Sequence, residues 1–288
     1  MILRSGIPTL AEISALTNTE LFAEILAFDE AFSRNYANVI RRHALRWGKH
    51  VMRHWSRRWE YPYVVERIGA SDCSAVHDRP VAVLDAGSGV TFLPYFLCRR
   101  NPNVRITCVD SVRSYTPAFQ RLNLITGVDS VTFRPATLQD MPLRDGSFDA
   151  IYCVSVLEHT GNYAAVLDEM LRVLTPGGEL ILTFDISLDG KDDISPAAAS
   201  ELLAMILQRF EFTDRLDAQA ELARLADPMA ILSTDAVRAA DPSLLPWKWP
   251  TLKSLYDLLC GRGWTGGFFS LACYCLHVQK PAENKRPP

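Results

Sequence analysis

The sequence lacks long apolar runs: nowhere do about eighteen apolar residues follow one another, which is the length that a membrane-spanning helix needs. Residues Met1 to Leu10 also lack the positive, apolar and small-residue segments of a secretory signal. A cytoplasmic protein that does not enter membranes is therefore expected. The seven cysteines form no C-x-x-C pair and have no histidines at zinc-finger spacing, which favours buried free thiols over a metal site.

An excess of charge of either sign is also absent. The formal net charge is −3 in 288 residues, of which 48% are hydrophobic and 22% charged, and such values give no global attraction to nucleic acid or membranes. This length favours one substantial α/β domain with an appendage over two independent domains. The sequence contains no internal repeat or low-complexity segment.

The region from Thr9 to about Gly69 has a helical pattern. Its apolar face is predicted to hold Ile40, Ala44, Trp47, Val51 and Trp55. Acidic residues are missing from Arg34 to Arg58, so the opposite face is strongly positive. The cations of this basic face include Arg42, Arg46, Lys49, Arg53 and Arg57. They could contact a phosphorylated small molecule or RNA. A solvated surface is the simpler alternative.

From Val81 onward, short β-branched runs alternate with amphipathic helical stretches, a pattern typical of βαβ units and a parallel sheet. The predicted strands are Val81–Asp85, Val104–Asp110, Val131–Phe133, Ala150–Val154 and Glu179–Phe184. Between the last two strands, apolar residues from Tyr163 to Leu174 follow helical spacing, and Pro176-Gly177-Gly178 then supplies a turn. A crossover helix is therefore predicted there.

The later part of the chain is less regular. An acidic loop after Ile186 leads into a predicted helix from about Ser195 to Phe210, and a last helix near Leu252 to Cys260 precedes a closing strand within Phe268 to Val278. The expected division is a helical extension or lid at 1–70 and an α/β domain at 71–280. That domain carries a helical insertion at about 195–250, and 281–288 form a frayed tail.

The strongest functional pattern is a strand that runs into a glycine turn, Val81-Ala-Val-Leu-Asp85-Ala86-Gly87-Ser88-Gly89, before a predicted helix. Glycines let the backbone approach a ligand closely, and doubly wound folds hold nucleotide-like ligands at such a turn. Asp110 ends the next strand, where its carboxylate can accept hydrogen bonds from both ribose hydroxyls. Capping of the turn before Ser111 is the alternative role for Asp110 alone.

Two features argue against a dinucleotide. Phe92 stands where the G-x-G-x-x-G motif has its third glycine, which normally allows tight packing around a pyrophosphate. Asp85, two positions before the first glycine, would repel a pyrophosphate and attract an ammonium. S-adenosylmethionine has an ammonium and a sulfonium and no phosphate. The Tyr-x-x-x-Lys pair common in nicotinamide-dependent oxidoreductases and sugar epimerases is also not found.

Over Val81 to Ile186 the sequence resembles the class I S-adenosylmethionine-dependent methyltransferases. The motifs that carry the resemblance are the acidic-x-Gly-x-Gly loop at Asp85–Gly89, the ribose-binding acid Asp110, the adenine-flanking segment Thr137–Leu143 with Asp145–Asp149, the strand end Cys153–His159, and the post-helix segment Leu171–Gly178. They occur in the family's order. Thr91 replaces the common third glycine of the loop, and Thr137 stands where an acid often precedes the adenine contact, so the local geometry there departs from the family pattern.

The resemblance implies an α/β fold of the Rossmann-like, three-layer type. Its sheet would be seven-stranded and mostly parallel with an antiparallel last strand, and the N-terminal extension would be helical. S-adenosylmethionine is the implied cofactor. Its binding residues would be Asp85, Ala86, Gly87, Ser88, Gly89, Asp110, Ser111, Thr137, Leu138, Val154 and Ser155.

The same resemblance implies a role for each part of this set. Gly87 and Gly89 would pass under the methionine portion, with Asp85 near the ammonium. Asp110 would hold the ribose. Leu138 would offer its backbone N–H to adenine, and the backbone around Val154 and Ser155 would close the methionine end.

The acceptor chemistry depends on residues at the rim of the site. Methyl transfer from a sulfonium needs mainly alignment, and a hydroxyl acceptor also needs a base. His159, just past the fourth strand, is the leading candidate, with a structural role as the alternative; Glu158 and Asp185 are the other candidates. The acids from Asp185 to Asp193 could hold a divalent ion, but nothing in their spacing requires it, and no metal is predicted.

Further patterns narrow the acceptor. The loop after the fourth strand contains neither the Asn/Asp-Pro-Pro-aromatic pattern of adenine or glutamine amino methylation nor a Pro-Cys nucleophile. Tyr61-Pro62-Tyr63 could form an aromatic lid over the acceptor or could pack in the core. Oxygen methylation of a small molecule is the leading expectation, with nitrogen methylation next and a phosphorylated or sugar-like acceptor included. The alternatives are a nucleic-acid methyltransferase that uses the basic helix and a non-catalytic protein of this fold. The sequence does not indicate the oligomeric state.

Overall fold

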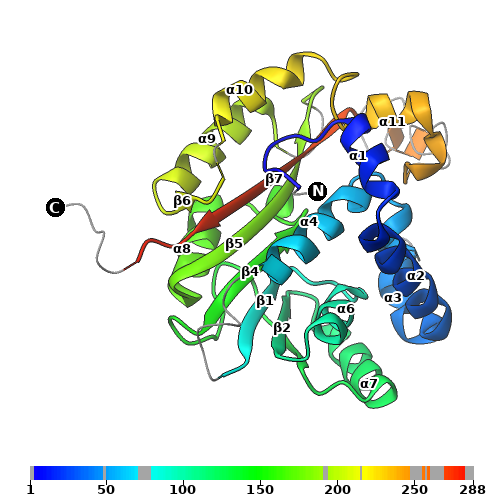
Figure 1. Cartoon of the computed structure of the whole chain (residues 1–288), viewed down its shortest axis with the longest axis vertical. Helices are drawn as coiled ribbons and strands as arrows, with labels where there is room; N and C mark the ends of the chain where they lie inside the picture. Colours follow the sequence, from blue (N-terminus) through cyan, green and yellow to red (C-terminus); the bar gives the residue numbers. More distant parts are fainter. Residues whose placement is uncertain are drawn as a thin grey trace.

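The central feature of the fold is one sheet between two layers of helices (Figure 1). A computed structural model describes residues 3–47, 50–70, 79–190, 194–214, 216–246, 255–256, 258–259 and 269–282. Within these residues, seven strands are arranged in the order β3-β2-β1-β4-β5-β7-β6. The strands are β1 Val81–Ala86, β2 Val104–Asp110, β3 Val131–Pro135, β4 Phe148–Val154, β5 Leu174–Ser187, β6 Glu211–Phe212 and β7 Leu271–Gln279.

The strand directions confirm the predicted fold class. β1 pairs in parallel with β2 and β4, β2 with β3, and β4 with β5. β7 runs antiparallel to both β5 and β6. The five predicted strands are present. β5 begins at Leu174, so Pro176-Gly177-Gly178, where a turn was predicted, lies within this strand, at an irregularity in its pairing with β4. The two-residue strand β6 follows the predicted helix of the insertion and is too short to produce a recognisable alternation of apolar and polar residues.

Successive residues of the central strands face opposite hydrophobic clusters, which explains the three layers. Val83 of β1 packs with α4 (Arg57–Ala70), α6 (Leu93–Arg100) and α7 (Thr116–Thr126). Its neighbour Leu84 packs on the other face with α8 (Tyr163–Val173), α9 (Pro196–Leu207) and α10 (Ala218–Ala223). Both faces of the sheet are therefore covered, and polar groups of the central strands can reach a ligand only at the strand ends.

The remaining short elements complete the described chain. They are α11 Thr234–Ala240 and the 3₁₀ turns η1 Val51–Arg53, η2 Arg113–Tyr115, η3 Leu157–His159, η4 Arg224–Ala226 and η5 Pro242–Leu244. No described helix is long and apolar enough to cross a membrane. The described cysteines are buried free thiols, namely Cys98, Cys108, Cys153, Cys273 and Cys275.

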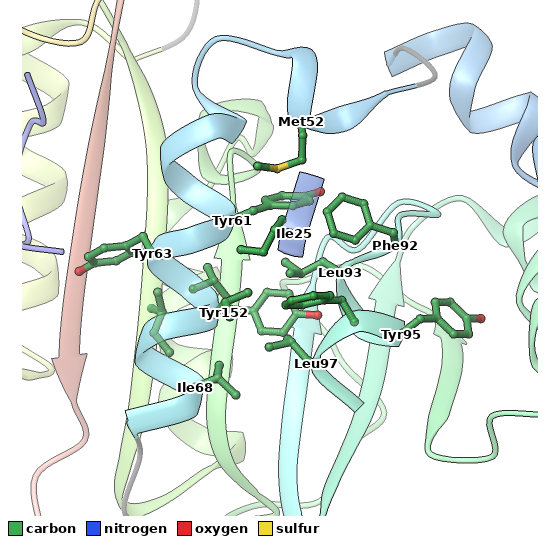
Figure 2. Packing of buried hydrophobic residues seen from close by; sticks show 14 of the residues in the cluster. Ile25, Met52, Tyr61, Tyr63, Ile68, Phe92, Leu93, Tyr95, Leu97 and Tyr152 are labelled. Carbon is green, nitrogen blue, oxygen red and sulfur yellow. The ribbon is translucent and has the colours of Figure 1, made fainter. Parts of the chain in front are cut away.

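The N-terminal helices share a hydrophobic cluster with the sheet. They are α1 Leu10–Thr17, α2 Glu20–Asn35 and α3 Ala37–Trp47, followed by α4. Figure 2 shows Ile25 of α2 and Met52 of η1 gathered around Tyr61 and Phe92. These helices are therefore packed against the α/β layers, and the division of the chain at residue 70 stays a prediction.

The predicted apolar face from Ile40 to Trp55 does not belong to one helix. α3 ends at Trp47, η1 begins at Val51, and α4 begins only at Arg57. Two tertiary hydrogen bonds fix the turn: the Met52 N–H donates to the buried Asp29 carboxylate at 3.1 Å, and the Trp55 N–H donates to the Leu244 carbonyl at 3.0 Å. Because the partners of these hydrogen bonds are distant in the sequence, the helical periodicity of residues 40–55 could not predict the turn.

Some predictions fall on residues that are not described. They concern most of the predicted helix from Leu252 to Cys260, the turn at 261–267, residues 191–193 of the acidic loop, residues 283–288 of the tail, and Cys73.

Candidate cofactor and acceptor site

The predicted site residues come together around one cavity. This cavity has a volume of about 830 Å³ and lies at the carboxyl ends of β1, β2, β4 and β5, within the size range of small-molecule sites. Every predicted site residue lines it except Ala86. Ala86 is buried in the hydrophobic cluster on the α8 side of the sheet, so only its backbone position in the turn relates it to the cavity.

The turn after β1 needs its glycines. Gly87 and Gly89 have φ values of +81° and +55°, a region that L side chains disfavour. A Cβ added at Gly87 would lie 2.5 Å from Cγ2 of Val156. The N–H groups of Gly87 and Ser88 both donate to the Val109 carbonyl, at 2.8 and 3.0 Å. The turn is thereby fixed against β2 with its glycines at the cavity wall.

Asp110 connects the end of β2 to the glycine turn. Its Oδ2 accepts a hydrogen bond from the Gly89 N–H at 2.9 Å, and its Oδ1 accepts one from the Val112 N–H at 2.9 Å. A carboxylate offers about four acceptor positions. The two backbone bonds orient this carboxylate and leave each oxygen able to accept one more hydrogen bond, which suits a ligand with a pair of hydroxyls.

Asp85 brings a buried carboxyl group to the same cavity. Burial raises its pKa to about 8; the Tyr152 hydroxyl opposes this shift, and the charge of Asp110 adds to it. A carboxyl with so high a pKa ionises readily only when a cation approaches. This environment therefore suits an ammonium group.

The loop after β3 forms the part of the cavity wall next to Asp110. The Ala136 N–H donates to the Asp110 carbonyl at 3.1 Å, and the Asp140 N–H donates to the Thr137 carbonyl at 3.4 Å. This tight turn holds Leu138, which is buried and lines the cavity together with Thr137. The predicted adenine-flanking residues thus lie beside the end of β2.

Ser155 has an unusual backbone. Its φ of +49° is the one positive value among the described non-glycine residues, and such a conformation is strained for a residue with a Cβ. The Ser155 N–H donates to the Thr183 carbonyl at 2.9 Å. The Ser155 hydroxyl donates to Glu60 Oε1 at 2.7 Å. These bonds offset the strain and place the end of β4 in the cavity wall.

Glu60 is a fully buried carboxylate at the centre of this network. It accepts hydrogen bonds from the Ser155 and Thr183 hydroxyls and forms an ion pair with Arg57. Burial opposes ionisation, but the charge of Arg57 and the hydroxyl hydrogen bonds hold the pKa of Glu60 below its usual value. The Arg57 Nη1 also donates to the Ser155 hydroxyl at 2.7 Å, so helix α4 is joined to the ends of β4 and β5.

The part of the cavity near η3 and β5 carries further titratable groups. The Asp185 N–H donates to Glu158 Oε1 at 3.4 Å. Burial, followed by the charge of Asp185, raises the pKa of Glu158 well above its usual range. The Glu158 Oε2 is buried without a hydrogen-bond partner among the described residues. His159, the next residue of η3, is exposed at the rim of the cavity.

Several residues of this site were not found from the sequence. Arg57 belongs to the basic face but points into the cavity and pairs with Glu60. His54 also lines the cavity, and burial together with the charge of Arg57 lowers its pKa to about 3, so its ring is neutral. Thr183 lies in the segment Leu180–Phe184 of β5, whose other residues are apolar. A hydroxyl residue inside a buried strand is a signal that could have pointed to a buried partner.

The expected aromatic lid has a mixed outcome. Tyr61 lines the cavity and packs against Phe92 with ring centroids 5.4 Å apart, whereas the buried Tyr63 points away and its hydroxyl lies 2.7 Å from that of Ser5. The lid hypothesis therefore retains only Tyr61. No group of three or more metal-ligating side chains is found among the residues with described positions.

The sheet order and the cavity at the strand ends define an α/β protein of the Rossmann-like, nucleotide-binding type. Residues 84–182, from β1 to β5, match a family model described as a methyltransferase domain. The segment from β1 to β5 is therefore similar in sequence to methyltransferase domains, and the sheet order around it is that of the Rossmann-like fold.

The similar proteins match only part of the sequence. A tRNA U34 carboxymethyltransferase of Syntrophotalea carbinolica is 29% identical over 116 residues, which are 39% of this chain and 34% of that protein. Methyltransferase GfsG of Streptomyces halstedii is 30% identical over 178 residues, covering 61% of this chain and 62% of GfsG. Less than two thirds of either relative is spanned.

One solved structure matches nearly the whole chain. It is geranyl diphosphate methyltransferase in complex with SAM, with a TM-score of 0.52 over 96% of this chain and 97% of that one. The sequence identity is 14%, so this likeness shows the fold alone.

Proposed function

We propose that this chain transfers the methyl group of S-adenosylmethionine to a small-molecule acceptor, with a hydroxyl as the leading acceptor group and an amine next. The observation that carries the proposal is the composition of the cavity of about 830 Å³. It contains the glycine turn and Asp110 at one side and the carboxyl and imidazole groups of Glu158, Asp185 and His159 at the other. One cavity thus offers both a cofactor cradle and an acceptor end.

The residues present fit this cofactor. The turn would be obstructed by a Cβ at Gly87, Asp110 retains capacity for two hydroxyls, and Asp85 is a buried carboxyl that a cation would ionise. Gly87 and Gly89 would support the methionine portion, Asp110 the ribose, and Leu138 the adenine. When bound, S-adenosylmethionine supplies a methyl group activated by a positive sulfur.

The residues of this chain would then align the acceptor and remove its proton. His159 is our leading base because an imidazole titrates near neutrality and this one is exposed at the cavity rim. Glu158 and Asp185 are the alternatives, since both line the cavity and the raised pKa of Glu158 makes its ionised form a stronger base. Burial of Glu158 Oε2 without a described partner also favours an acceptor that donates a hydrogen bond.

A phosphorylated acceptor is less favoured by the described contacts. Of the basic face, Arg57 is paired with Glu60, and Arg53 lies 3.6 Å from Glu30. The cavity itself carries the carboxyl groups of Asp85, Asp110, Glu158 and Asp185 against the single guanidinium of Arg57. A phosphate would meet these carboxyl groups and one guanidinium that is already paired with Glu60, so a neutral or cationic acceptor is favoured.

Calorimetric titration tests the cofactor assignment directly. We expect binding of S-adenosylmethionine and S-adenosylhomocysteine and no binding of NAD. A methyl-release assay over metabolite and RNA pools then identifies the acceptor class. Absence of measurable affinity for both adenosyl compounds would sink the proposal, and methyl release from RNA alone would replace the small-molecule acceptor by a nucleic acid.

A further inference from the structure

Helix α3 reaches the glycine turn through His43. The imidazole is buried with 7% of its surface exposed, and its Nδ1 accepts a hydrogen bond from the Val90 N–H at 3.2 Å. A Cβ added at Gly89 would lie 2.5 Å from the His43 Cε1. The ring therefore lies directly over the turn, and it lines the cavity that we assign to the cofactor.

Two successive amides of the turn are thus held from two directions. The Gly89 N–H donates to Asp110 at the end of β2, and the Val90 N–H donates to His43 of α3. Because Nδ1 is the acceptor, the neutral ring has its proton on Nε2. Without His43, the Val90 amide would lose this partner, and the orientation of Gly89 against Asp110 would be less restricted.

His43 also forms part of a wall between two cavities. Its ring packs edge-on against Tyr115, with centroids 5.9 Å apart. Both residues line the cofactor cavity and a second cavity of about 810 Å³ between α3 and α7. Truncation of the imidazole would connect these spaces beside Gly89 and Asp110.

We propose that His43 is a positioning residue for the cofactor, which fixes the Gly89–Val90 peptide and closes the ribose side of the cavity. This inference rests on the proposed function. It makes helix α3, which lies outside the residues that match the methyltransferase model, a part of the cofactor site. The family motif in the turn is then incomplete without a side chain from the helical region.

The test uses S-adenosylhomocysteine and two replacements of different chemistry. His43→Asn keeps an acceptor close to the place of Nδ1, whereas His43→Leu keeps bulk and removes the acceptor. We expect affinity to fall at least about tenfold for His43→Leu and to stay within about threefold of wild type for His43→Asn. Asn38→Leu is the matched control, because Asn38 lies on α3 and lines only the second cavity.

A double-mutant cycle tests the direct contact over Gly89. Gly89→Ala should weaken binding strongly in the wild type, because the new Cβ meets the imidazole. In the His43→Ala background the same change should cost several-fold less, with only the strain of the positive φ remaining. Additive effects would overturn the contact, and thermal unfolding of each variant shows that the fold is retained.

The outcomes separate the two proposals. If the wild type binds neither S-adenosylmethionine nor S-adenosylhomocysteine, the proposed function and the role of His43 both fail. If the wild type binds and His43→Leu binds equally well, only the role of His43 is overturned. If His43→Leu and His43→Asn both lose affinity for S-adenosylhomocysteine, the shape of the ring and not its acceptor nitrogen positions the turn. That result would overturn the role of the hydrogen bond.

Discussion

The hydroxyl of Ser155 donates to the buried carboxylate of Glu60 at 2.7 Å, and this bond joins helix α4 to the strained end of strand β4. The positive φ of Ser155 places the residue in the cavity wall. Since strained backbone persists only where surrounding contacts determine it, Glu60 acts on the shape of the cavity at the end of β4 from a helix outside the residues that match the methyltransferase model.

Replacement of Glu60 should therefore be costly. Glu60→Gln keeps the size of the side chain but leaves the Arg57 guanidinium, whose side chain is 20% exposed, without its ion-pair partner. Breaking a buried ion pair costs about 3–5 kcal/mol in free energy of unfolding, and the partial exposure of Arg57 favours about 3. Urea denaturation measures this. Glu24→Gln, which breaks the exposed pair with Arg100, is the control and should cost less than about 1 kcal/mol; equal losses would contradict the central role of Glu60.

Asp110→Asn should weaken cofactor binding. Both oxygens of the Asp110 carboxylate accept hydrogen bonds, whereas an Asn side chain accepts only at its single oxygen. The variant therefore loses a hydrogen bond to a ribose hydroxyl or to the N–H of Gly89 or Val112. Hydrogen bonds to a charged group contribute about 1.5–3 kcal/mol, so the dissociation constant of S-adenosylhomocysteine should rise by about ten- to a hundredfold. Calorimetry measures it, with Asp129→Asn as control, because Asp129 is exposed and does not line the cavity. Unchanged affinity in Asp110→Asn would remove the ribose assignment.

The sheet could be predicted because its pattern is local. The apolar runs of β1 and β4 are bounded by turns, and strands buried on both faces need such runs. β6 could not be found this way, because its two residues join the sheet only through the neighbouring β7. The break between α3 and α4 could not be predicted either, because it depends on hydrogen bonds that the Met52 and Trp55 N–H groups donate to Asp29 and Leu244, which are distant in the sequence.

The same distinction explains what the sequence indicated of the site. The glycine turn and Asp110 follow the strand order of one βαβ unit, so their spacing along the chain was sufficient to place them together. His43, Arg57 and Glu60 enter the cavity or its supporting network from the N-terminal helices. Their positions depend on how those helices pack on the sheet, and packing between distant segments has no fixed sequence spacing.

Cofactor binding should release a proton through Asp85. Its pKa of about 8 in the free protein means that the carboxyl is mostly protonated at pH 7, and pairing with an ammonium requires the ionised form. The pKa falls on binding, so affinity should rise with pH, by up to about tenfold per unit between pH 6 and 8. Calorimetry at pH 7 in buffers of different ionisation enthalpy should show close to one proton released, and none for Asp85→Asn.

Stability should respond to the same group with the opposite sign. The folded-state pKa of Asp85 lies above the unfolded value, so protonation favours the folded state and this contribution is lost as the pH rises toward 8. Asp85→Asn should therefore unfold at a higher temperature than the wild type at pH 8 to 9, although it binds the cofactor less well. A variant that lost both stability and binding at this pH would show that the carboxylate is structural.

Sinefungin can probe the acceptor end before the acceptor is known, because it carries a protonated amine in place of the transferable methyl. If Glu158 and Asp185 border that position, the amine gains a charge-assisted hydrogen bond. Sinefungin should then bind about ten- to a hundredfold more tightly than S-adenosylhomocysteine. The ratio of the two affinities should fall in Glu158→Gln and Asp185→Asn, because each variant removes a carboxyl group that can ionise and pair with the amine.

His159→Gln separates positioning from proton removal. His159 is exposed at the rim, so its replacement should leave the ratio of sinefungin to S-adenosylhomocysteine affinity unchanged. Turnover of the acceptor found in the methyl-release assay should fall by about a hundredfold or more if the imidazole is the base. Undiminished turnover in His159→Gln, together with a large loss of turnover in Glu158→Gln at equal cofactor affinity, would instead assign proton removal to Glu158. The structure is consistent with that role, because Glu158 combines a raised pKa with a buried oxygen that has no described partner.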